Sequence, residues 1–186
     1  ENNQSEDLLK WIVLLVNSHA TERGIDFNGY DGMKRTILHY ACLYKSQVFF
    51  NEALSLFVQN RISLNICTDL YGQTPLHLLA VSKVNTSFHI DEEICDILIQ
   101  LNADYKAIDH LGHTAAYYAL VNRKYGTLES LITTFGHEAV LNEKNNKGEN
   151  LLQELMIEKD VQKSSKVALP DDGNDMFEYL MMNYAN

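Results

Sequence analysis

Histidines are the most versatile side chains of this chain, because an imidazole can bind a metal or transfer a proton near neutral pH. Two of the seven histidines, His110 and His113, stand three residues apart, with Asp109 beside them. Such a set could form a surface metal site, but the segment offers no clear fourth ligand and is expected to be a solvent-exposed turn. We therefore interpret the two histidines as solvent-exposed finger residues rather than metal ligands.

Catalytic nucleophiles have no recognisable setting in the sequence. Cys42, Cys67 and Cys95 lie too far apart to form the paired spacing of a zinc site or a redox dithiol. They are typical of small buried apolar residues in a reducing compartment. The sequence contains no Ser-His-Asp or Cys-His pattern, no Gly-rich phosphate loop and no HExxH motif. It therefore predicts no enzymatic activity, no cofactor and no bound metal.

The charge balance limits the kinds of partner. The chain has 15 Lys and Arg residues against 25 Asp and Glu residues, a net charge of −10, and no short basic cluster, so we expect no direct binding to nucleic acid. The longest apolar run, residues 11–16, is far shorter than the roughly 20 residues that span a membrane. We expect an intracellular protein, cytoplasmic or nuclear. Because the sequence starts at Glu1 without Met, we also expect it to be part of a longer protein.

An internal repeat organises the elements that position these side chains. Its clearest copy, residues 69–77, reads Asp-Leu-Tyr-Gly-Gln-Thr-Pro-Leu-His. The spacing Asp-x-x-Gly-x-Thr recurs at residues 109–114, and partial copies begin at Asp31 and Asn145. Each copy is followed by apolar stretches with helical spacing. The pattern predicts a finger-like turn followed by a helix in every copy.

Each residue of the motif has a physical role in that structure. Gly72 and Gly112 permit the positive φ of a tight hairpin tip. A threonine two residues later stands where a helix N-cap would be, as Thr36, Thr74 and Thr114. Pro75 then occupies the first helical position, where its missing N–H group costs nothing.

These residues resemble the ankyrin repeat, whose pattern Asp-x-x-Gly-x-Thr-Pro-Leu-His-x-Ala recurs about every 33 residues. The resemblance covers roughly residues 8–182 and implies an all-α solenoid of helix-turn-helix units with β-hairpin or loop fingers. It also implies that His39 and His77 form hydrogen-bonded bridges to neighbouring backbone. The chain departs from the pattern at three positions, where Lys34 replaces Gly and Tyr117 and Gln153 replace His.

The resemblance implies a single domain, residues 1–186, with about five repeats. We expect an N-terminal half repeat, three fuller repeats and a degenerate C-terminal repeat, at residues 8–28, 31–66, 69–106, 109–142 and 145–183. An inserted loop is expected at residues 158–174. Neighbouring repeats must stack, because one repeat cannot bury its apolar face alone.

The resemblance also implies a protein-interaction scaffold that binds a segment or domain of a partner protein through its concave inner-helix face and finger tips. Apolar and aromatic side chains occupy the variable positions of the copies, as hot spots require. The expected partner-binding residues are Tyr40, Leu43, Tyr71, Leu78, Val81, His110, Leu111, Tyr118 and Val121. The alternative for these side chains is burial by inserted segments or by tight stacking.

Other functions fit the same sequence. One is a structural spacer inside a larger regulatory protein, such as a transcriptional regulator, in which flanking chain covers the apolar side chains. Another is a non-catalytic domain fused to an enzyme. The acidic run at residues 91–93 is explained by its place near a helix N-terminus, but it also leaves a basic partner possible.

Overall fold

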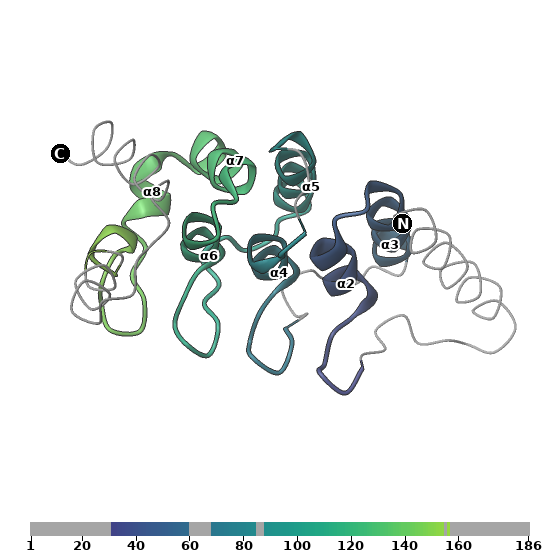
Figure 1. The fold of residues 1–186 in the computed structure, drawn as a ribbon, viewed down its shortest axis with the longest axis horizontal. Coiled ribbons are helices and arrows are strands. Elements are labelled where there is room, and N and C mark those ends of the chain that lie inside the picture. The colour runs from purple at the N-terminus through teal and green to yellow at the C-terminus, as the bar shows by residue number, and fades with distance from the viewer. Residues whose placement is uncertain (1–30, 60–67, 85–87, 155, 157–186) are drawn as a thin grey trace, which may run out of the picture.

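The computed structural model describes residues 31–59, 68–84, 88–154 and 156. These residues form pairs of antiparallel helices that follow one another along the molecule (Figure 1). The inner helices are α2 (Ile37–Tyr44), α4 (Pro75–Val81) and α6 (Ala115–Val121), and the outer helices are α3 (Gln47–Gln59), α5 (Phe88–Gln100) and α7 (Tyr125–Phe135). The short helix α8 (His137–Leu141) follows α7. None of the described helices is long and apolar enough to cross a membrane.

Inner helices begin where the sequence places a threonine cap. The hydroxyl of Thr74 accepts a hydrogen bond from the N–H of His77, and Pro75 occupies the first turn of α4. The hydroxyl of Thr114 likewise accepts from the N–H of Tyr117 at the start of α6. The caps therefore fix the point at which each finger turns into its inner helix.

The core lies between the rows of helices. Inner helices pack side by side, α2 against α4 and α4 against α6, while α5 packs against α7 in the outer row. Small side chains recur on the inner helices and are completely buried, namely Ala41, Ala80 and Ala119. Because alanine occupies little space, these positions let neighbouring helices approach closely. Larger apolar side chains, among them Leu38, Leu76 and Phe50, fill the remaining interior.

Four loops, which we call the fingers, project from the helix rows at residues 31–36, 69–74, 109–114 and 145–150 (Figure 1). In each finger the first residue closes the loop through its side chain. The Oδ1 atom of Asp69, for example, accepts the N–H groups of Tyr71 and Gln73 at 2.8 and 3.0 Å. The first residues of the other fingers make the same pair of contacts: Asp31, Asp109 and Asn145. A short β-bridge, Ile108 with Thr114, closes the base of the third finger.

The expected all-α solenoid with projecting fingers is therefore confirmed. The division into about five repeats remains a prediction, because the N-terminal half repeat and the inserted loop lie outside the described residues. Lys34 stands at the finger position that Gly occupies elsewhere and adopts the same left-handed conformation, with φ of 57°. The finger thus keeps its shape at this departure from the motif, at the conformational cost of a non-glycine residue.

Glycine-to-alanine variants test the finger geometry. Gly72 has φ of +76°, and a Cβ atom there would lie 2.7 Å from Cδ2 of His110 in the next finger. Gly148 has φ of +79° with open space around it, and Gly32 has neither constraint. In urea unfolding we expect Gly72→Ala to cost about 2 kcal/mol or more, Gly148→Ala about 1 kcal/mol and Gly32→Ala almost nothing. Equal losses at the three positions would contradict the described finger packing.

Candidate functional site

A buried histidine joins two neighbouring repeats. The Nδ1 atom of His77 accepts the backbone N–H of Thr74 at 3.2 Å, and its Nε2 atom contacts the carbonyl oxygen of His113 at 3.1 Å. Because an amide nitrogen donates and a carbonyl oxygen accepts, the ring is neutral and carries its proton on Nε2. The side chain is fully buried, and burial lowers the pKa of His77 below its ordinary value. His77 therefore acts as a structural bridge between repeats.

Two other repeats satisfy the same backbone N–H at the start of the inner helix, one with histidine and one with glutamine. His39 repeats the bridge, accepting the N–H of Thr36 at 3.1 Å and contacting the carbonyl oxygen of Gln73 at 3.1 Å. In the fourth finger Gln153 replaces histidine, and its Oε1 atom accepts the N–H of Asn150 at 3.0 Å. Glutamine can thus replace histidine as the acceptor for the backbone N–H at the helix start.

Tyrosines of the inner helices bind the first residue of their own finger. The hydroxyl of Tyr118 donates to Oδ2 of Asp109 at 2.6 Å, and that of Tyr40 donates to Oδ2 of Asp31 at 2.5 Å. Burial acts to raise the pKa of Asp109, but hydrogen bonds from Tyr118 and from the backbone outweigh it and leave the pKa below its usual value. Burial and Asp109 together raise the pKa of Tyr118. The structure thus gives both tyrosines a structural role that sequence reasoning missed, although the shared Asp-x8-Tyr spacing could have revealed it.

Leu78 occupies the equivalent position in the middle repeat, and the expectation that its side chain is exposed is wrong. Only 1% of Leu78 is accessible. Its helix α4 lies between the inner helices α2 and α6, which pack against it on both sides (Figure 1). In place of a tyrosine hydroxyl, Asp69 of this finger accepts a hydrogen bond from Nε of Arg35 in the preceding repeat, at 3.2 Å.

The remaining predicted binding residues stay at the surface to different degrees. On the finger tips Tyr71 is 54% and Leu111 is 70% exposed, and His110 is also exposed. On the inner helices Val121 is exposed, whereas four others are half-buried: Tyr40, Leu43, Val81 and Tyr118. Backbone hydrogen bonds tie adjacent fingers together, since Leu70 N–H donates to Met33 and His110 N–H donates to Tyr71. The structure therefore brings the tip residues into one continuous row.

A buried ion pair links repeats at the other end of the inner helices. Lys45, which ends α2 in a left-handed conformation, places its Nζ atom 2.8 Å from Oδ2 of Asp91 in α5. Burial lowers the pKa of Lys45 to about 8, because it outweighs the hydrogen bond and the charge of Asp91, which act to raise the pKa. Asp91 is itself buried and paired with Lys45, so its carboxylate is not a free acidic group for a basic partner.

The cysteines of the described residues lie in the interior. Cys42 and Cys95 are buried free thiols, and burial raises the pKa of both, that of Cys95 to about 12. Within the ranges that the structure describes, no group of three or more His, Cys, Asp or Glu side chains could hold a metal ion. Cys67 lies outside those ranges.

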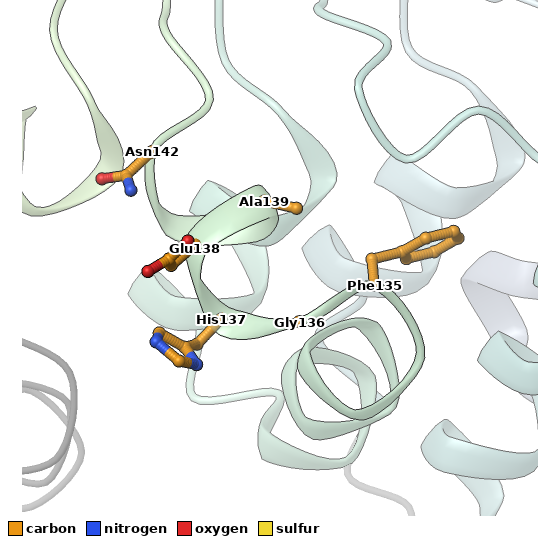
Figure 2. A pocket seen from close by; sticks show the side chains of 6 residues that line it. All are labelled: Phe135, Gly136, His137, Glu138, Ala139 and Asn142. Atoms are coloured by element: carbon orange, nitrogen blue, oxygen red, sulfur yellow. The ribbon is translucent and has the colours of Figure 1, made fainter.

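A surface hollow lies next to α8. It is lined by Phe135, Gly136, His137, Glu138, Ala139 and Asn142. Figure 2 shows that the side chains of Phe135 and His137 point away from each other rather than toward a common centre. The ring of Phe135 stacks on that of Tyr105, with centroids 3.9 Å apart. Phe135 is therefore engaged in the fold and contributes no polar group to the hollow.

The His77 bridge predicts a pH dependence of stability. Because the pKa of His77 is lowered in the fold, the unfolded chain binds a proton below about pH 6.5 that the folded chain does not, and stability falls as the pH drops through this range. The variant His77→Gln should keep the cap, as Gln153 does, and lose this part of the pH dependence. Urea unfolding at pH 7.5 and 5.5 measures both proteins. An identical loss of stability on acidification in the two would rule out the neutral bridge.

The tyrosine contact predicts a loss of stability without its hydroxyl. Tyr118→Phe removes a hydrogen bond to the buried carboxylate of Asp109, and we expect a cost of about 1–2 kcal/mol in urea unfolding. Tyr71→Phe is the matched control, because Tyr71 is exposed on a finger tip. If both variants unfold alike, the Tyr118 hydroxyl does not stabilise the finger.

Comparison with known families agrees with this geometry. Residues 1–109, more than half of the chain, match the family model described as ankyrin repeats, in three copies. No curated protein sequence shows a significant match. Ankyrin repeats are generally protein–protein interaction modules, and the family is typically non-catalytic. The chain therefore belongs to the ankyrin repeat family.

Proposed function

We propose that this chain binds a segment of a partner protein along its finger tips and the adjoining exposed side of the inner helices. The observation that carries this proposal is the row of exposed apolar side chains on neighbouring finger tips. Leu70, Tyr71 and Leu111 are 44%, 54% and 70% exposed. Large apolar side chains that gather at one surface of a folded chain are typical of a binding site.

Rigid support for these side chains favours tight binding. Each finger is closed by hydrogen bonds to its first side chain, and the first three fingers are joined through their backbones. A partner therefore meets tip residues that are already ordered. Because little further conformational entropy is lost on binding, more of the contact energy contributes to affinity.

The inner helices extend the same surface. Val121 at the end of α6 is 44% exposed, and Tyr44 at the end of α2 is 49% exposed and stacks on Tyr40 with ring centroids 6.2 Å apart. Half-buried Leu43 and Val81 lie on the same row of helices. Tyrosine and apolar side chains in this arrangement are the kinds that hot spots use. They support the inner helices as the second part of the binding surface.

The proposal predicts that a charge on a finger tip abolishes partner capture without unfolding the chain. Leu111→Asp places a carboxylate at the most exposed large apolar residue of the finger tips, and we expect at least a tenfold loss of affinity for proteins captured from cell lysate. Val58→Asp is the matched control, because Val58 is 56% exposed but lies on outer helix α3. Both variants should keep their unfolding free energy within about 0.5 kcal/mol of the parent chain.

Two results would contradict the proposal. One is capture of the same proteins by the Leu111→Asp variant and the parent chain. The other is equal loss with Leu111→Asp and Val58→Asp, which would show that the finger tips are not distinguished from the outer helices. Thermal unfolding of each variant, measured alongside, separates lost binding from lost structure.

A further inference from the structure

The tips of the fingers carry positive charge, whereas the net charge of the whole chain is negative. The three residues after the first position of each finger include Lys34, His110 and Lys147 and no Asp or Glu. Lys34 and Lys147 are both exposed, one on the first finger and the other on the fourth. The exposed apolar residues of the second and third fingers lie between them (Figure 1).

Carboxylates at the bases of the fingers are engaged by the fold. The Oδ1 atom of each accepts two backbone N–H groups of its own finger. The Oδ2 atoms accept side-chain donors: Tyr40 for Asp31, Arg35 for Asp69, and Tyr118 and Gln73 for Asp109. Asp69 and Asp109 are also buried, at 3% exposure each. Asp31 stays at the surface near Lys34, whereas Asp69 and Asp109 do not. Within the three tip residues of each finger, the exposed Lys or Arg residues are Lys34 and Lys147.

Negative charge collects instead on the outer helices. The sequences of α3, α5 and α7 contain no Lys or Arg. They carry acidic side chains that reach the surface wholly or in part: Glu52, Glu92, Glu93, Asp96 and Glu129. The described part of the chain thus has an acidic outer row and cationic finger tips. An acidic partner is repelled by the first and attracted by the second.

We propose that the finger row binds a protein segment with an apolar centre flanked by Asp or Glu residues. The apolar centre contacts Tyr71 and Leu111, and the flanking carboxylates face Lys34 and Lys147. This inference rests on the proposed protein-binding function and adds the chemistry of the partner. It predicts a partner opposite to the basic one that the net charge of −10 alone suggests.

A random peptide library displayed on phage tests the inference with the full chain as bait. Selected peptides are sorted by whether their binding is lost on Leu111→Asp, and those that depend on Leu111 are sequenced. We expect an apolar centre and enrichment of Asp and Glu on its flanks. Peptides that depend on Leu111 but carry neutral or basic flanks would overturn the inference while leaving the proposed function intact. If no selected peptide depends on Leu111, both fail.

Charge reversal of the lysines gives the second measurement. Lys34→Glu and Lys147→Glu should each weaken a selected acidic peptide about fivefold at low salt, and less at high salt, because an exposed charge pair is worth up to about 1 kcal/mol and is screened. Lys83→Glu makes the same charge change in the turn after α4, away from the fingers, and should have little effect. Equal weakening by all three variants would reduce the effect to net charge and overturn the inference. Binding of a single-stranded oligonucleotide with the same dependence on Lys147 would show general anion binding and would overturn it as well.

Discussion

The stacking of this chain depends on satisfying the backbone where each finger turns into its inner helix. The first N–H groups of a helix have no partner within the helix, and here they lie next to the following repeat, where water is excluded. His77 meets both needs with one ring, since Nδ1 accepts the N–H of its own helix start and Nε2 contacts the carbonyl oxygen of His113. The bridge therefore sets the position of one repeat relative to the next.

The same requirement separates residues that stabilise the fold from residues that are left for binding. Asp109 closes its finger and is in turn held by Tyr118, so both side chains are engaged within the chain. The tip residue Leu111 contributes its backbone N–H to this closure, while its side chain is 70% exposed. A finger is thus fixed by its backbone and by the carboxylate of its first residue. Its tip side chain is free to vary without loss of the fold, which is the property a binding surface needs.

Charged side chains also divide into two groups, those paired inside the fold and those left at the surface. Lys45 and Asp91 form a buried pair between repeats, and Arg35 binds Asp69 across the same repeat boundary. Desolvation of the buried charges offsets much of the attraction in such pairs. On the surface, the outer helices α3, α5 and α7 carry carboxylates and no Lys or Arg, while exposed lysines stand on the tips of the first and fourth fingers.

Local patterns in the sequence were enough to predict the fingers, the helix caps and the all-α solenoid. The contacts that define them, such as Asp69 with Tyr71 and Gln73, join residues two to four positions apart, so a short motif contains all the partners. Tertiary structure alone decided that Leu78 is buried and that Lys45 pairs with Asp91, 46 residues away. These outcomes depend on how closely neighbouring helices pack and on which side chains they bring together, and no local spacing encodes either.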